Sequence, residues 1–230
     1  MSVVSSREEI LSTIKRALSN GAGTAPGLVD PPILDMDKAR PPGADLVRHF
    51  ESELTGVGGR FYRAANAESV CAYILQVAAE REAKAIVAWE APLMDEIGLK
   101  GSLTRNGISF GTDTGDGEIV ASAAASDIGV TGVDYALAET GSLVLLARKG
   151  QSRSVSLLPP VHIALIKPGQ VLSGFDDLFA ILHHSLESAE TALSSAITFI
   201  TGPSRTADIE LTLVVGVHGP QELHVVLLEG

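Results

Sequence analysis

The chain has 230 residues, 45% of them hydrophobic and 4% aromatic, which suffices for one α/β domain with a core of Ala, Val, Leu and Ile. Its net charge of −11 excludes the basic surface by which proteins bind nucleic acid or anionic membranes. A single cysteine, Cys71, excludes an intrachain disulfide and an iron–sulfur cluster held by this chain alone. Because the sequence shows neither a signal peptide nor an apolar run of the roughly 18–20 residues that span a membrane, we expect a soluble cytoplasmic protein.

The first predicted element is an amphipathic helix in residues 5–20, which begins with a serine cap, carries acidic residues in its first turn and basic residues near its end. Residues 21–43 follow with five prolines, four glycines and little periodicity, which predicts an extended arm. We therefore expect two parts: an N-terminal helix and arm, residues 1–43, and an α/β domain, residues 44–230.

Helices and strands alternate from the start of the predicted domain. Residues 44–54 have helical spacing, and residues 60–64 are strand-like. A second helix, residues 66–82, is capped by Asn66 and presents an apolar stripe that includes Cys71, which we interpret as a buried core thiol. The apolar run at residues 84–89 predicts a buried strand.

The middle of the chain is expected to hold shorter elements. Residues 91–99 predict a short helix and residues 106–110 another strand. Residues 118–132 are predicted to start as a helix of small residues and to end near a turn. Residues 133–147 then hold two strand-like runs around "ETG", which predicts a hairpin whose turn needs the positive φ of Gly141.

The last third continues the alternation. Residues 162–167 and 196–200 are strand-like and flank a predicted helix in residues 174–195. Two further strand-like runs, residues 210–216 and 222–229, are separated by a "VHGP" turn. The alternation predicts an α/β fold with a mostly parallel sheet flanked by helices, and the hairpin and the C-terminal strands suggest some antiparallel edges.

The stretch "TGPSRTADIE", residues 201–210, is the first candidate site. Ser204, Arg205 and Thr206 offer hydroxyls, a guanidinium and backbone N–H groups, and Asp208 could orient the arginine. A helical turn starting here would direct its N–H groups at an anion. The alternative is a polar helix cap with a solvated arginine.

The same stretch also resembles the G-x-S-x-G elbow of serine hydrolases, with Ser204, Asp208 and His218 in the hydrolase order. Two features disfavour that interpretation. Thr206 stands where the elbow needs glycine, and the 26 residues after Ser204 are too few to return an acid and a histidine to the serine.

Two turns supply further candidates. Glu139 and Thr140 lie at the hairpin turn, with Thr131 on the approach to it, and turns at strand ends are common places for ligand contacts. A solvated glutamate in a hairpin is the alternative. His218, next to Gly219, suits proton transfer near neutral pH, although a turn histidine can also cap a carbonyl.

Three stretches resemble the LUD-domain family, and within it the lactate utilization protein C group: "GVTGVDYALAETGSLVLLA", "RSVSLLPPVHIALI" and "TGPSRTADIELTLVVGVHGPQELHVVLLE". The N-terminal "REEILSTIKRAL" and "RHFESELTGVGGRFYRA" also resemble its opening. The resemblance implies a fold similar to the sugar-phosphate isomerase and CoA-transferase class (NagB/RpiA/CoA transferase-like). It also implies a bacterial system that oxidises L-lactate to pyruvate, whose partner subunits carry iron–sulfur clusters while this chain binds no cofactor itself.

The family motifs coincide with the candidates chosen on chemical grounds, which gives a predicted ligand-binding set for a small anion but no catalytic assignment. The set comprises Thr131, Glu139, Thr140, Gly141, Ser204, Arg205, Thr206, Asp208, His218 and Gly219. We expect a subunit of a lactate-oxidising system that contributes an anion-binding pocket. The alternatives are a stand-alone enzyme or binding protein for a sugar phosphate or CoA ester, and a non-catalytic assembly module.

Overall fold

A computed structural model describes residues 7, 10–13, 15–16, 43–113, 118–187, 196–207 and 213–230. It separates Met1–Lys38 from Ala39–Gly230 as two units, and the fold described below is that of the second. In the first unit, residues 10–13 are helical, within the predicted N-terminal helix. The division at residue 43 stays a prediction. Among the described helices, none combines the length and the apolar character required to cross a membrane.

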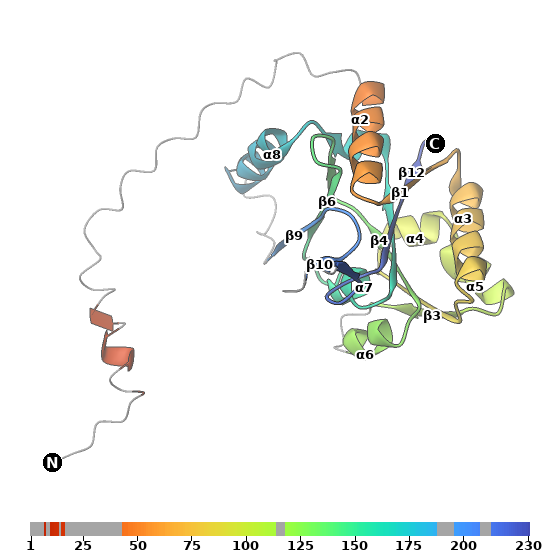
Figure 1. Cartoon of the computed structure of the whole chain (residues 1–230), viewed down its shortest axis with the longest axis horizontal. Helices are drawn as coiled ribbons and strands as arrows, with labels where there is room; N and C mark the ends of the chain where they lie inside the picture. Colours follow the sequence, from red (N-terminus) through yellow and green to blue (C-terminus); the bar gives the residue numbers. More distant parts are fainter. Residues whose placement is uncertain are drawn as a thin grey trace. The chain divides into compact units, whose positions relative to one another are not determined.

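A six-stranded sheet forms the centre of the domain, and all its strands are parallel (Figure 1). The strand order is β1-β12-β7-β4-β2-β3. The strands are β1 (Arg60–Ala64), β2 (Ala85–Ala88), β3 (Ser109–Thr112), β4 (Ile128–Gly132), β7 (Val161–Ile166) and β12 (Glu222–Leu228). The short apolar runs that predicted strands are therefore buried by helices on both faces, as parallel sheets require.

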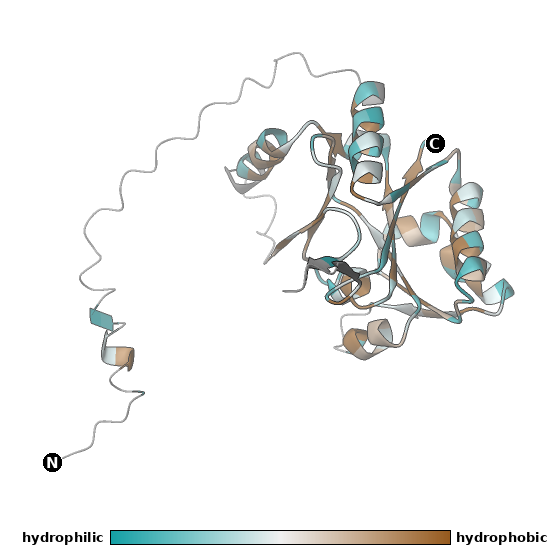
Figure 2. Cartoon of the chain, viewed as in Figure 1, coloured by the Kyte–Doolittle hydropathy of each residue, from teal (hydrophilic) through white to brown (hydrophobic). Residues whose placement is uncertain are grey.

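Helices cover both faces of this sheet. One face packs against α3 (Ala67–Glu80), α4 (Pro92–Glu96) and α5 (Leu99–Arg105). The other packs against α2 (Gly43–Gly56), α6 (Ile119–Ala124) and α7 (Ser154–Leu157). Figure 2 shows the strands of the sheet mostly in the hydrophobic colours, while the helices carry both colours.

A smaller four-stranded sheet packs onto the α2 face, with the order β8-β5-β6-β9. It comprises β5 (Tyr135–Leu137), β6 (Ser142–Leu146), β8 (Val171–Leu172) and β9 (Ile197–Ile200), with a 3-10 turn, η1 (Pro168–Gln170), before β8. Every residue of β6 is buried, because helix α8 (Phe175–Glu187) packs on its far face. A separate two-stranded hairpin joins β10 (Arg205–Ala207) to β11 (Leu213–Val215).

Several predicted elements are confirmed in detail. The side chain of Asn66 accepts a hydrogen bond of 2.9 Å from the Ser69 N–H, which closes the predicted cap of α3. Gly141 has φ of 63° in the β5–β6 turn. Cys71 is buried with its Sγ 3.0 Å from the Ile97 carbonyl oxygen, and burial raises the pKa of this thiol.

Three expectations are wrong. Residues 128–132, expected to end near a turn, form the central strand β4, where Gly129 is required because a Cβ would lie 1.9 Å from the Val155 carbonyl oxygen of α7. The last strand, β12, is not an antiparallel edge but lies between β1 and β7, parallel to both. The helical turn expected after Pro203 is instead strand β10, which pairs with a Leu-Val-Val run.

Candidate functional site

The two main segments of the predicted ligand-binding set meet the same part of α2, its C-terminal end. A Cβ added to Gly141 would lie 2.3 Å from the Leu54 backbone nitrogen. The guanidinium of Arg205 approaches Gly58, two residues beyond the helix, so closely that a Cβ there would lie 2.3 Å from Nη2. The hairpin turn and the Arg205 segment, more than sixty residues apart, are thus placed around one helix end.

Hydroxyl groups connect the hairpin turn to the segment that precedes Ser204. Thr140 Oγ1 donates to Ser142 Oγ at 2.7 Å, and Ser142 Oγ lies 2.6 Å from Thr201 Oγ1. The connection follows from the register of β6 with β9, which pairs Leu143 with Ile200 and so brings Ser142 beside Thr201, the residue after β9. The sequence did not single out Ser142 or Thr201.

Ser204 and Gly219 are neighbours, since a Cβ on the glycine would lie 3.3 Å from the Ser204 Cβ. The Ser204 N–H donates to the Pro220 carbonyl at 2.9 Å, so this N–H is not available to an anion. What the segment offers instead is Arg205, which is exposed and has no ion pair with a described carboxylate. His218 is also exposed. We name Thr140, Ser204, Arg205 and His218 the Arg205 cluster.

Four other members of the predicted set lie elsewhere or outside the described residues: Thr131, Glu139, Thr206 and Asp208. Glu139 is exposed, with its carboxylate against Gly174. Thr131 is fully buried in β4, 2.8 Å from Nε2 of His162 in β7. The Thr206 side chain and all of Asp208 fall outside the described residues. The binding role of every member of the set stays a prediction.

His162 itself is a buried polar group of the core. It is 0% exposed, its Nδ1 has no hydrogen-bond partner among the described residues, and burial, with the nearby His224, lowers its pKa to about 3. His224, in the neighbouring strand, accepts or donates a 2.9 Å hydrogen bond with the Tyr73 hydroxyl. Both histidines were predicted to lie within strands, and both do.

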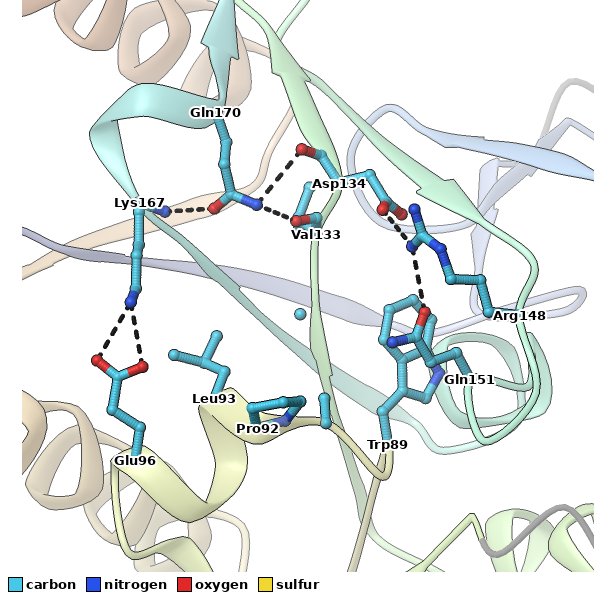
Figure 3. Close-up of a pocket in the computed structure, with 12 residues that line it drawn as sticks. Trp89, Pro92, Leu93, Glu96, Val133, Asp134, Arg148, Gln151, Lys167 and Gln170 are labelled. Carbon is cyan, nitrogen blue, oxygen red and sulfur yellow. Dashed lines mark hydrogen bonds and ion pairs between the residues drawn. The ribbon is translucent and has the colours of Figure 1, made fainter. Parts of the chain in front are cut away.

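A pocket that the sequence did not predict lies at the carboxyl ends of β2, β4 and β7 (Figure 3). After β2 the chain crosses to β3 on one side, whereas after β4 it crosses to β7 on the other. The gap between β2 and β4 is therefore a topological switch point, where open α/β sheets bind ligands. We name this cavity of about 340 Å³ the switch-point pocket.

Two ion pairs lie on opposite sides of this pocket (Figure 3). On one side, Lys167 Nζ lies 3.1 Å from both carboxylate oxygens of Glu96. On the other, Arg148 Nη1 donates to Asp134 and, at 3.3 Å, to Gln151 Oε1. Gln170 connects the two sides of the pocket through hydrogen bonds. Its Oε1 accepts from the Lys167 N–H at 2.7 Å, and its Nε2 donates to the Val133 and Asp134 carbonyl oxygens.

Comparison with known proteins gives three findings. A model of the LUD domain family matches residues 47–228. Lactate utilization protein C of Halalkalibacterium halodurans is 41% identical over 150 residues, 65% of each chain, and that of Bacillus subtilis is 38% identical over 144 residues, 60% of this chain and 59% of the relative. The matched region thus spans less than two thirds of these relatives.

A crystal structure of a DUF162 family protein from Deinococcus radiodurans superposes with a TM-score of 0.56. The superposition covers 81% of this chain and 98% of that one, at 19% identity. At this identity the likeness concerns the fold alone, and it agrees with the α/β class and the parallel sheet expected from the sequence.

Proposed function

Because this chain belongs to the LUD domain family, we propose that it is a subunit of a bacterial L-lactate utilization system and acts with iron–sulfur partner proteins. The similarity to relatives named lactate utilization protein C carries the proposal. In this reading the oxidation of L-lactate to pyruvate releases two electrons and two protons, and the electrons leave through the clusters of the partner proteins.

The Arg205 cluster is the proposed binding place for the lactate carboxylate. A guanidinium binds a carboxylate through two parallel N–H bonds, and Arg205 is exposed and without an ion pair to any described carboxylate. His218 is the exposed titratable side chain of the cluster, and Glu139 is exposed in the hairpin turn next to Thr140. We propose that one of them accepts the proton of the lactate hydroxyl.

An exposed apolar surface favours a second candidate, the non-catalytic assembly module. Phe175 and Phe179 of α8 and Phe199 of β9 are 36%, 54% and 40% exposed, and their rings contact one another at centroid distances of 6.3 and 5.3 Å. Contiguous exposed apolar side chains are typical of surfaces that contact another protein. In that case partner assembly, and not lactate binding, would be the contribution of this chain.

Growth on L-lactate separates the two candidates. In a strain that lacks its own lactate utilization protein C, we expect the wild-type chain to restore growth and Arg205→Ala to reduce it at least about tenfold, the cost of losing one charged contact. Arg205→Lys keeps the charge but loses the planar pair of N–H donors, so it should restore growth only in part. Arg153→Ala, which removes another exposed arginine, is the matched control and should behave as wild type.

If Arg205→Ala restores full growth while Phe179→Ser abolishes it, the assembly role is correct and the anion role is wrong. Circular dichroism of each purified variant checks that it is folded.

A further inference from the structure

We propose that the switch-point pocket is a separate ligand site, which binds an organic anion made of one carboxylate or phosphate group joined to an apolar body larger than that of lactate. This pocket shares no lining residue with the Arg205 cluster. The proposal therefore goes beyond the proposed role in lactate utilization, and neither depends on the other.

Arg148 has N–H groups that no described residue uses. Its guanidinium carries five N–H groups, and Nη1 uses its two for Asp134 and Gln151. The other three, on Nε and Nη2, have no hydrogen-bond partner in the described part of the chain. Asp134 is only 12% exposed and also accepts the Leu146 N–H at 2.7 Å, so it fixes the arginine in place. A fixed guanidinium with free N–H groups is suited to a carboxylate or a phosphate.

The ion pair on the other side of the pocket, Lys167 with Glu96, is exchangeable. Lys167 and Glu96 are each about half exposed, and such pairs contribute only about 0–1 kcal/mol. An incoming anion can therefore take the place of the Glu96 carboxylate on Lys167 at little cost. Glu96 thus competes with the ligand for Lys167. If the ion pair were purely structural, there would be no such competition.

The cavity is larger than lactate and has an apolar wall. Its volume of about 340 Å³ reaches the range of about 300–1,000 Å³ that is typical of small-molecule sites. Lactate, with six non-hydrogen atoms, would leave most of it empty. Pro92, Leu93 and Val133 line the cavity between the two ion pairs (Figure 3), Ala91 also lines it, and these side chains suit an apolar body.

The chain contains its own reporter for this site. Trp89, which lines the pocket, is the single tryptophan of the sequence, and its indole N–H donates to the Ser152 carbonyl at 2.9 Å. Titration of the whole chain with 4-phenylbenzoate and with 4-phenylphenyl phosphate, followed by tryptophan fluorescence and by calorimetry, should give saturable binding with at least one of them. The anion that binds distinguishes a carboxylate from a phosphate ligand. The neutral 4-phenylbenzamide should bind at least about tenfold more weakly.

Variants locate the binding. Lys167→Met and Arg148→Met should each weaken the anion about tenfold, and Glu96→Gln should strengthen it about two- to fivefold because the competitor is gone. Lys149→Met removes an exposed cation that does not line the pocket and should leave the affinity unchanged. Lys167 and Glu96 are on the surface, so their variants remain informative even if Arg148→Met fails to fold.

The proposal is overturned if neither anion binds saturably, or if the neutral amide binds as well as the acid. It is also overturned if Lys149→Met weakens binding as much as Lys167→Met, or if Glu96→Gln has no effect.

Discussion

Replacing Gly141 by alanine should lower the free energy of unfolding by about 3 kcal/mol. Two costs add up. The residue has φ of 63°, which costs an alanine roughly 1–2 kcal/mol. The new Cβ would also lie 2.3 Å from the Leu54 backbone nitrogen and 2.7 Å from the Glu53 carbonyl carbon, and such overpacking costs about 1–3 kcal/mol. Because the obstacle is helix backbone, no side-chain rotation relieves it.

Gly107→Ala is the matched control. Gly107 has φ of 72°, but a Cβ there would meet nothing within 4 Å, so only the conformational cost applies, about 1 kcal/mol. Urea unfolding of both variants measures the difference. Equal destabilisation by the two substitutions would show that the hairpin turn does not press against α2, and the shared position of the predicted segments would then be wrong.

Acidification from pH 7 to pH 4 should lower the free energy of unfolding by about 3 kcal/mol through His162 alone. Burial, with a smaller contribution from His224, lowers the pKa of His162 to about 3 in the folded protein, against 6.5 when it is solvated. Between these values the unfolded chain binds a proton that the folded protein does not. Lower pH therefore favours unfolding, and the stability present above pH 6.5 is lost progressively down to about pH 3.

The double variant Thr131→Val, His162→Leu isolates this contribution. It removes both partners of the 2.8 Å contact, so no buried group is left unpaired by the change. Carboxylates and His224, whose pKa is also lowered by burial, titrate in both proteins and cancel in the comparison. Urea unfolding at pH 7, 5.5 and 4 should give a shallower pH dependence for the variant. Parallel curves would mean that His162 is protonated or solvated in the folded state.

The alternation of helices with short apolar runs predicted the parallel sheet because each run is buried on both faces. The central strand β4 was not predicted, because it does not follow this pattern. Its sequence, Ile-Gly-Val-Thr-Gly, holds two glycines, and Gly129 is there because α7 lies too close for a side chain. Local pattern cannot reveal such an approach, since the partner residue, Val155, is 26 positions later in the chain.

The two candidate sites differ in how far the sequence predicts them. The Arg205 cluster was found from local chemistry, because hydroxyls, a guanidinium and a histidine gather at turns. The backbone that carries Arg205, however, is a strand and not the expected helical turn. The switch-point pocket was missed, since Glu96, Arg148 and Lys167 are ordinary surface residues when taken one at a time. Only the order of β2, β4 and β7 in the sheet brings them together.

Lactate-dependent dye reduction tests the central claim most directly. An extract of a strain without its lactate utilization protein C supplies the partner proteins, and the purified chain is added back as wild type, Arg205→Ala or Arg153→Ala. We predict that wild type and Arg153→Ala restore L-lactate-dependent reduction and that folded Arg205→Ala restores at most about a tenth of it. If the wild-type chain restores nothing in an extract that its own homologue reactivates, the proposed role in lactate utilization is wrong.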